Sequence, residues 1–533
     1  MNVADHIVQK LVDEGVEVLF TVPGEQMDAL FGALARTDIR VVHTRHEQGA
    51  AFMAYGYARS TGRIGACAVI SGPGVLNATA GLATAYSGDS RVLCIAGQIP
   101  TPMLDRRYGF PHELPDQLGV LRGVTGWAAR VGTPDEVTAV LGEAFHRLRS
   151  GRPRPVAIEI PTDVFAAPVT APAGWTDPPV SRAPDATAIE AAVAELAAAR
   201  TPLIVVGSGA RAATDQVTRL AERLRAPVTS NMGGRGVVSD EHELSVPLPV
   251  AHRLWAEADV VLAIGTRLMR PSVEWGLTGL RVIRVDLDPE EINRVAEPAV
   301  AVVADAALTV EALLSRLPDS PDDRSAWLSR LKEARAEFEA DLARLAPQAE
   351  LLRALRAALP ADGFFVDELT QVGYVSRMGF AAWSPSTYVP ATYQGALGCG
   401  FATALGVKVA NPTRPVLSIS GDGGFLYTAV ELATAVRHRV NVVAVVFNDN
   451  NYANVSRSQL ARNGETVGTD LHNPDFVAFA EAFGARGVRV ETSDELTARI
   501  VEAFRRDDLP TVIELPVGDM PSPWSLIRLP RVR

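Results

Sequence analysis

The chain has 533 residues, which is too long for one ordinary core, so about two to four domains are expected. Apolar residues make up 47% of the chain and charged residues 21%, enough to bury sizeable cores in a protein of ordinary soluble composition. The net charge of −11 is opposite to that of a nucleic-acid-binding surface. We therefore expect no nucleic-acid partner, and nothing indicates an anionic membrane partner.

The three cysteines, Cys67, Cys94 and Cys399, lie far apart in apolar or glycine-rich runs. We expect buried free thiols in a reducing compartment, and their spacing does not indicate zinc. No apolar run approaches the length of a membrane span. The first residues, 1–6, contain no basic segment before the first amphipathic helix, so no signal peptide is predicted. A cytoplasmic protein is expected.

Predicted strands and helices alternate through residues 1–168, which predicts a parallel sheet covered by helices. Residues 101–127 form an irregular segment, and long loops in α/β domains are more often functional than idle. The expected strands are 16–22, 40–43, 66–70, 91–97 and 155–160, and the expected helices are 3–15, 27–35, 49–62 and one opening near Asn77.

Two further α/β units follow the first. Residues 166–186, rich in Pro, Ala and Thr, are predicted to be a linker, and a second linker begins at Leu317 before a charged helix over 324–345. Gly207-Ser-Gly209 lacks the full dinucleotide fingerprint, so a plain turn is preferred to an NAD site of an oxidoreductase. We predict an α/β protein of three doubly wound parallel-sheet domains, with the boundaries 1–168, 187–316 and 345–533. The central strands are expected at 202–206, 226–229, 259–264 and 281–286.

Two strand ends in the third unit carry polar residues. Strand 415–420 leads into Gly421-Asp-Gly-Gly424, a helix is expected over 426–437, and strand 440–447 leads into Asn448-Asp-Asn-Asn451. In a parallel sheet both ends lie at the same edge, so Asp422 and Asp449 are expected to meet. Carboxylate, amide and backbone oxygens suit Mg²⁺, and a glycine-rich helix start suits a diphosphate. Each end alone is typical of an ordinary turn or loop, but together they predict a metal and diphosphate site.

Glu47 is the candidate partner of that site. It follows a short strand and precedes a helix of small residues, including Gly49, Ala50, Ala51, Ala54 and Gly56. A glutamate there commonly serves only the helix dipole. The small residues, however, let another surface approach, which would desolvate the carboxylate and raise its pKa. Such a group suits proton exchange with a weakly basic heterocycle.

Further motifs lie in the first unit: Arg45-His-Glu-Gln-Gly-Ala-Ala51, Gly56-Tyr-Ala-Arg59, Ser71-Gly-Pro-Gly74 with Asn77, and Gly97-Gln98. Together with residues 421–451, they resemble the thiamine diphosphate-dependent acetolactate synthase and 2-oxo acid decarboxylase family, including its benzoylformate decarboxylase-like members. The resemblance covers essentially the whole chain and implies pyrimidine-binding, central and diphosphate-binding domains. It implies an enzyme, a lyase or transferase, that decarboxylates and/or ligates 2-oxo acids through an enamine intermediate.

The resemblance also implies the role of each matching residue. Glu47 would be catalytic and would hydrogen-bond the pyrimidine N1′. The Gly395 carbonyl would accept a hydrogen bond from the 4′-amino group, and Leu397 would bend the cofactor. Mg²⁺ would be held by Asp422, by Asp449, where family members often have Asn, and by the backbone carbonyl of Asn451. The other expected cofactor-binding residues are Pro23, Gly24, Asn77, Gly373, Gly421, Gly423, Gly424 and Tyr452.

Family members form each site between two subunits, which implies at least a homodimer and a homotetramer as the expected assembly. The expected partners are a 2-oxo acid and an aldehyde or keto acceptor. In the irregular loop, His112, Glu113 and Gln117 are candidate substrate residues, although a solvated loop pair explains the first two equally well.

The central domain departs from acetolactate synthases. The Arg-Phe-Asp-Asp-Arg-like segment that accompanies FAD is not found, and residues 265–270 take its place. A tightly bound FAD is therefore not expected, although the sequence leaves FAD or an adenine nucleotide open. The alternatives are an FAD-containing acetolactate synthase of branched-chain amino-acid biosynthesis and a non-catalytic nucleotide-binding or regulatory homologue. Glu47 and Asp422 argue against the second alternative, but the donor acid and the acceptor stay unidentified.

Overall fold

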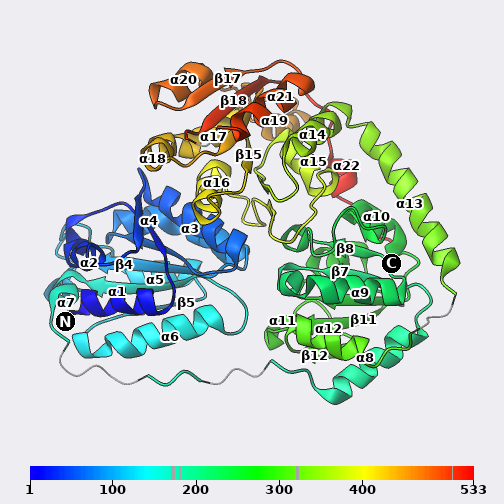
Figure 1. Ribbon diagram of the computed structural model, residues 1–533, viewed down its shortest axis with the longest axis horizontal. Helices are drawn as coiled ribbons and strands as arrows, with labels where there is room; N and C mark the ends of the chain where they lie inside the picture. Colours follow the sequence, from blue (N-terminus) through cyan, green and yellow to red (C-terminus); the bar gives the residue numbers. More distant parts are fainter. Residues whose placement is uncertain (170–174, 179–181, 320–322, 507) are drawn as a thin grey trace.

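The computed structural model describes residues 1–169, 175–178, 182–319, 323–506 and 508–533. It contains three six-stranded parallel sheets, each in its own lobe (Figure 1). Their strand orders are β2-β1-β3-β4-β6-β5, β12-β11-β10-β7-β8-β9 and β14-β13-β15-β16-β18-β17. The predicted fold class, three doubly wound α/β units, is confirmed. The two predicted linkers fall partly on residues 170–174, 179–181 and 320–322, outside the described residues.

The first lobe contains every strand that the sequence predicts there and one more, β5. Helix α5 lies inside the segment predicted to be irregular; its two glycines, Gly119 and Gly123, lower helix propensity, but the Asp116 side chain caps its start. Helix α4 begins at Pro73, before Asn77, because proline is favourable in a first helical turn. The strands are β1 (Val18–Thr21), β2 (Arg40–His43), β3 (Gly65–Val69), β4 (Val92–Gln98), β5 (Trp127–Arg130) and β6 (Val156–Pro161), and the helices are α1 (Val3–Asp13), α2 (Asp28–Leu34), α3 (Glu47–Thr61), α4 (Pro73–Ser87), α5 (Gln117–Val124), α6 (Val137–Arg149) and α7 (Thr162–Ala166).

The central lobe adds two short edge strands, β9 and β12, to the four predicted strands. A Cβ on Gly207 would lie 2.2 Å from the carbonyl oxygen of Gly265, so the turn after β7 packs tightly against the end of β10. The strands are β7 (Leu203–Val206), β8 (Val228–Ser230), β9 (Ser245–Val246), β10 (Val260–Ile264), β11 (Arg281–Asp286) and β12 (Val300–Val303), and the helices are α8 (Ala186–Ala198), α9 (Thr214–Leu224), α10 (Leu248–Trp255), α11 (Pro289–Ile292) and α12 (Ala306–Leu314).

Helix α13 leads from the central lobe to the third lobe along one edge of the molecule (Figure 1). The single helix predicted over 426–437 is instead two helices, α17 and α18, joined by a 3₁₀ turn at Ala429–Glu431. The helices are α13 (Ser325–Ala343), α14 (Ala346–Ala358), α15 (Gln371–Gly379), α16 (Cys399–Ala410), α17 (Asp422–Thr428), α18 (Leu432–His438), α19 (Ala453–Asn463), α20 (Phe476–Ala482), α21 (Ser493–Phe504) and α22 (Trp524–Ile527), and the strands are β13 (Phe364–Val366), β14 (Tyr388–Val389), β15 (Val416–Gly421), β16 (Val443–Asn448), β17 (Arg486–Arg489) and β18 (Thr511–Pro516).

Helices α3 and α16 join the first and third lobes. A Cβ on Gly56 would lie 2.1 Å from the carbonyl oxygen of Thr403, and one on Gly406 would lie 2.0 Å from that of Met53. Glycines at both positions allow the two backbones to touch, and one apolar cluster continues across them from the first sheet into the third. The helix that begins at Glu47 is therefore packed against the C-terminal domain of its own chain.

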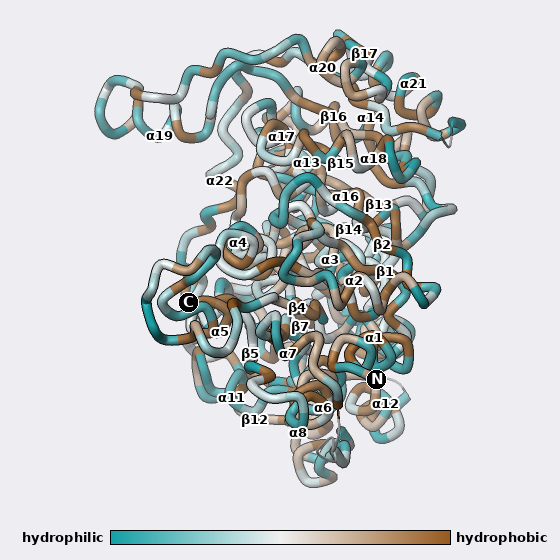
Figure 2. Tube along the Cα trace, turned by 90° about the vertical axis from the view of Figure 1, so that its left-hand side faces the viewer, coloured by the Kyte–Doolittle hydropathy of each residue, from teal (hydrophilic) through white to brown (hydrophobic). Residues whose placement is uncertain are grey.

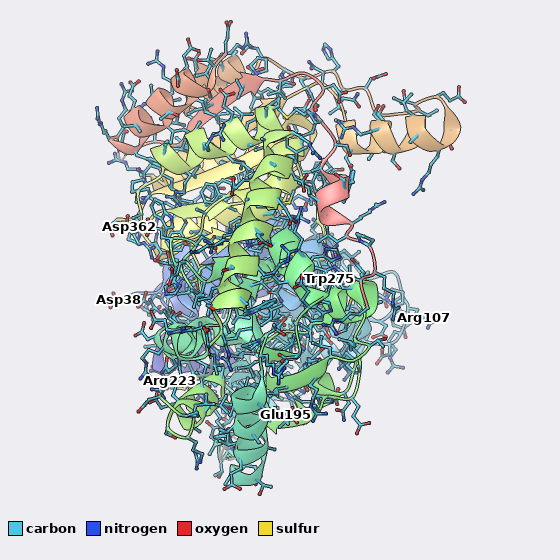
Figure 3. All side chains as sticks on the ribbon, turned by 90° about the vertical axis from the view of Figure 1, so that its right-hand side faces the viewer. Asp38, Arg107, Glu195, Arg223, Trp275 and Asp362 are labelled. Carbon is cyan, nitrogen blue, oxygen red and sulfur yellow. The ribbon has the colours of Figure 1, made fainter. Side chains whose placement is uncertain are left out.

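Helix α19 projects from the third lobe in two opposite views (Figures 2 and 3). Its only buried residue is Ser456, and the side chains of Val455 and Leu460 are about half exposed. Across the described ranges of the chain, no helix combines the length and the apolar character needed to cross a membrane.

Candidate active site

Asp422 and Asp449 come together at the carboxyl ends of two neighbouring strands. Gly421, the last residue of β15, is paired with Phe447 on β16, so the residues that follow leave the sheet at the same edge. Burial raises the pKa of Asp422. Burial and the nearby charge of Asp422 raise the pKa of Asp449 to about 6. The two carboxylates therefore come together as predicted, and the charge of Asp422 destabilises the ionised form of Asp449.

Short hydrogen bonds orient both carboxylates. Asp422 accepts from the backbone N–H of Gly423 (2.9 Å) and from the side-chain amide of Asn473 (2.7 Å). Asp449 accepts from the backbone N–H of Asn451 (3.1 Å) and from Nε2 of Gln371 (2.7 Å). Sequence reasoning missed Asn473 and Gln371, because neither lies in a motif and both reach the site through the folded chain.

The oxygen atoms at this edge fit Mg²⁺. The side-chain oxygen of Asn451 is buried without a hydrogen-bond partner, beside two carboxylates that a divalent cation would neutralise. Among the described residues, no group of three His, Cys, Asp or Glu side chains could hold a metal. The further ligands would therefore be backbone or amide oxygens of this chain, or phosphate oxygens of a bound cofactor.

The glycines after β15 leave no room for side chains. A Cβ on Gly423 would lie 2.4 Å from the Tyr452 ring, and one on Gly424 would lie 2.4 Å from Oε1 of Glu368. Both residues line a cavity of about 210 Å³ together with Leu397, Asp422 and Asp449. The cavity is lined further by Gly421, Asn451, Tyr452 and other residues between 369 and 520. We call residues 421–424, 449–452 and Leu397 the diphosphate half-site.

The Leu397 loop is held from behind by a buried carboxylate. Gly395 and Gly398 have φ of +64° and +81°, which favour glycine, so the loop turns sharply before α16. Glu368, which is 0% exposed, accepts from the backbone N–H groups of Gly398 and Gly400 and from the hydroxyl of Ser420 (2.6 Å). Glu368 therefore ties the Leu397 loop to the end of β15.

Gly373, a predicted cofactor-binding residue, makes contacts within its own segment. Its backbone N–H donates to the Thr370 hydroxyl (2.8 Å) at the start of α15, and a Cβ there would lie 1.9 Å from the carbonyl oxygen of Glu368. It does not line the 210 Å³ cavity. Its cofactor contact stays a prediction.

Glu47 is the first residue of α3 and is 8% exposed. Asn77 donates to its Oε2 (2.9 Å), so two residues predicted on the pyrimidine side do meet. Gly74 at the start of α4 lies nearby, since a Cβ on it would be 3.5 Å from Oε1 of Glu47. The predicted residues Pro23 and Gly24 follow β1, and Gly24 packs directly against Ile70. We call Glu47, Asn77, Pro23 and Gly24 the pyrimidine half-site.

One chain does not bring the two half-sites together. The cavity of the diphosphate half-site is lined entirely by residues of the C-terminal domain, and Glu47 does not reach it. One chain therefore contains the residues of both half-sites, but it holds them in two separate places.

The three candidate substrate residues have different surroundings. Gln117 is buried and braces its own domain: its Oε1 accepts from the Gly72 N–H (2.8 Å), and its Nε2 donates to the Gly97 carbonyl and to Glu159 (both 2.9 Å). Glu113 closes its own loop by accepting from two backbone N–H groups, those of residues 109 and 110. His112 has φ of +68°, and its Nδ1 lies 3.4 Å from the Gln26 amide. Their contact with substrate stays a prediction.

A second cavity, of about 410 Å³, lies where the three domains meet. Its walls combine apolar residues such as Trp275 (labelled in Figure 3) and Leu526 with the guanidinium groups of Arg59 and Arg267. Residues 266–270, which belong to the segment 265–270 singled out in the sequence, form part of its wall together with Pro271.

Comparisons with known proteins agree with this geometry. Residues 1–120, 189–313 and 371–515 match the family models for the N-terminal TPP binding domain, the central domain and the C-terminal TPP binding domain of thiamine pyrophosphate enzymes.

The chain is similar to a probable 2-ketoarginine decarboxylase of Pseudomonas aeruginosa, with 37% identity over 96% of this chain and 93% of the relative. It is also similar to a probable acetolactate synthase large subunit of Methanocaldococcus jannaschii (30% identity; 95% of this chain, 90% of the relative). The acetolactate synthase of Bacillus subtilis is 29% identical over 96% of this chain and 93% of its own length. The chain therefore belongs to the thiamine diphosphate-dependent acetolactate synthase and 2-oxo acid decarboxylase family.

Proposed function

We propose that this protein decarboxylates a 2-oxo acid with thiamine diphosphate and Mg²⁺ bound at the diphosphate half-site. The observation that carries the proposal is the pair Asp422 and Asp449, which meets at the wall of a cavity shared with Leu397. In this assignment the two carboxylates and the Asn451 carbonyl hold Mg²⁺, and the backbone N–H groups of Gly423 and Gly424 bind the diphosphate. When bound, thiamine diphosphate supplies the electron sink for loss of carbon dioxide.

Glu47 is proposed to hold the proton shared with the pyrimidine N1′. Asn77 already occupies Oε2, so Oε1 is the oxygen left for the cofactor. The low exposure of the carboxylate keeps water from competing for that contact. A Glu47→Gln variant keeps the shape but cannot exchange the proton, so it should bind the cofactor and lose turnover. Normal turnover by this variant would refute the assignment.

The active site is proposed to form between two subunits, so the working unit is at least a homodimer. The support is the separation of the two half-sites within one chain, together with the projecting helix α19 and its half-exposed Val455 and Leu460. Light scattering of the purified protein distinguishes a dimer from the homotetramer that we propose as the full assembly. We also propose a reducing, cytoplasmic location, in keeping with three buried free cysteines.

Mixing two inactive variants tests the shared site. Glu47→Gln lacks a working pyrimidine half-site, and Asp422→Ala lacks a working diphosphate half-site. If each site combines two chains, a mixed dimer contains one intact site, and an equal mixture after subunit exchange should recover about a quarter of the wild-type activity. If each site belonged to one chain, the mixture would stay inactive. Each variant incubated alone is the matched control.

The donor proposed for the first assay is 2-ketoarginine, because a relative 37% identical over 96% of the chain is a probable 2-ketoarginine decarboxylase. A panel of 2-oxo acids, including pyruvate and benzoylformate, should be supplied with and without aldehyde acceptors. Release of carbon dioxide with an aldehyde product identifies a decarboxylase, and a chiral hydroxyketone identifies a carboligase. No release from any 2-oxo acid by the cofactor-loaded protein would overturn the proposal.

The second candidate is an FAD-containing acetolactate synthase. The observation that favours it is the 410 Å³ cavity at the domain junction, which residues 266–271 help to line. Flavin absorbance of the purified protein, with acetolactate formed from pyruvate, would select this candidate. Colourless protein that releases carbon dioxide without forming acetolactate would select the first.

A further inference from the structure

Glu431 is a buried carboxylate of the C-terminal domain that contacts the chain just before Glu47. It ends the 3₁₀ turn between α17 and α18 and is 0% exposed. The Arg45 N–H lies 3.1 Å from each of its two oxygens, and the His46 N–H lies 3.1 Å from Oε1. The Thr434 hydroxyl donates to Oε2 (2.5 Å). The carboxylate therefore accepts hydrogen bonds from two backbone N–H groups of the N-terminal domain, and Thr434 of its own domain holds it in place.

The close approach of Glu431 depends on a glycine at position 49. A Cβ on Gly49 would lie 2.3 Å from Oε1 of Glu431, so any side chain there would push the carboxylate away from the start of α3. A negative charge at a helix N-terminus is also favourable because the free N–H groups there carry partial positive charge. Gly49, which the sequence marked only as a small residue, thus allows a specific interdomain contact.

We propose that Glu431 is a positioning residue for Glu47. Asn77 holds the side chain of Glu47 from one side, and Glu431 holds the two residues before it from the other. Loss of the carboxylate would leave two backbone N–H groups without their partner and free the first turn of α3 to shift. A shift of about 1 Å in a proton-handling group can reduce the rate about 100-fold. This inference rests on the proposed role of Glu47.

Glu431 also connects the two half-sites of one chain. It follows α17, the helix that begins at the proposed metal ligand Asp422. The loop that it holds leads into Glu47, which in the proposed dimer serves the cofactor bound by the partner. The segment 422–431 therefore carries Asp422, which would serve one active site, and holds the residues before Glu47, which would serve the other.

Glu431→Gln tests the proposal first in the cofactor-free protein. Glutamine keeps the volume but has only one acceptor oxygen. Either the His46 N–H loses its partner at Oε1 or the Thr434 hydroxyl loses its partner at Oε2, and the Arg45 N–H keeps one of its two contacts in both cases. Backbone hydrogen exchange over residues 44–48 should become about 10-fold faster or more, because the protecting acceptor is weakened. In the loaded enzyme, kcat should fall about 10- to 100-fold while the dissociation constant for thiamine diphosphate stays within about 2-fold of wild type.

Two further variants separate positioning from a general loss of stability. Gly49→Ala leaves every charge in place and displaces the carboxylate by sterics, so it should reproduce both the faster exchange and the lower kcat. His438→Gln is the matched control: His438 lies at the same domain boundary, where its Nε2 is 3.2 Å from Nδ1 of His43, and no hydrogen bond joins it to residues 44–47. It should leave exchange over 44–48 at the wild-type rate.

The outcomes are decisive in each direction. Wild-type exchange over 44–48 and wild-type kcat in both Glu431→Gln and Gly49→Ala would overturn the inference, as would an equal effect of His438→Gln. If Glu431→Gln does not fold, Gly49→Ala decides the question alone. Glu47→Gln tests the underlying function separately: an active Glu47→Gln refutes the role of Glu47, whereas an inactive Glu47→Gln beside a fully active Glu431→Gln refutes only the positioning role.

Discussion

Replacing Glu368 by Gln should make the cofactor-free protein less sensitive to rising pH. Burial raises the pKa of Glu368 to about 7, against an ordinary value of 4.5, although its hydrogen bonds to Ser420, Gly398 and Gly400 favour ionisation. A pKa that is higher in the folded chain means that folding favours the protonated acid. The stability that this provides is complete below about pH 4.5 and is lost as the pH rises through 7. At about 1.4 kcal/mol per pKa unit, the loss reaches about 3 kcal/mol above pH 7.

The assay is thermal unfolding of both proteins between pH 5 and pH 8. Glutamine resembles the protonated acid and does not titrate, so the difference in midpoint between variant and wild type should grow with pH. For a domain of this size, about 3 kcal/mol corresponds to roughly 6 to 12 °C. Taking the difference removes the contribution of Asp449, whose pKa burial also raises to about 6. Besides burial, the charge of the neighbouring Asp367 raises the pKa of Glu368 itself, so its influence is part of the measured difference. Glu339→Gln, on the exposed side of α13, controls for removal of a charge. Parallel pH curves for wild type and Glu368→Gln would refute the reasoning.

Two further substitutions test the diphosphate half-site. Asp422→Ala removes one of the two proposed metal carboxylates, so thiamine diphosphate should bind at least about 10-fold more weakly and lose its dependence on Mg²⁺; calorimetric titration showing unchanged binding would contradict the assignment. Gly424→Ala places a methyl group 2.4 Å from Oε1 of Glu368, so the turn must move and cofactor affinity should fall, whereas an unchanged dissociation constant would show that the turn does not contact the diphosphate.

The residues that sequence reasoning located are those whose position follows from topology. Asp422 and Asp449 each follow an apolar strand, and parallel strands end at a common edge, so their meeting could be predicted from the order of elements. Glu47 could be found because a helix begins at it. The fold class was predictable for the same reason. The edge strand β9 was missed because two residues show no periodicity, whereas β12 was missed although its four residues alternate between buried and exposed.

Other site residues could not be located from local pattern. Glu368 and Glu431 each lie in a segment with no motif, and each reaches a loop distant in sequence: Glu368 reaches Gly398, and Glu431 reaches Arg45. From sequence alone, an Asp or Glu side chain is expected on the surface. The structure is needed to show that Glu368 and Glu431 are buried and accept hydrogen bonds from backbone N–H groups. Gln117, a polar residue predicted at the substrate, shows a contact that its sequence did not indicate, because it accepts from the Gly72 N–H; its contact with substrate stays a prediction.

Three buried carboxylates of the C-terminal domain share one property: their burial makes the ionised form unfavourable. Burial raises the pKa of Glu368, Glu431 and Asp449, so each reduces the stability of the folded chain at neutral pH relative to an apolar or neutral residue. A loss of folding stability of this kind is retained where the carboxylate makes hydrogen bonds that an apolar side chain could not make. Glu368 fixes the loop of Leu397, and Glu431 fixes the residues before Glu47. Each of the two therefore acts on a loop that carries a predicted cofactor residue, which is where an enzyme gains most from a rigid backbone. In the proposed assignment, the C-terminal domain therefore does more than bind the diphosphate, because it also holds the residues that precede Glu47, the proposed proton-handling group of the other domain.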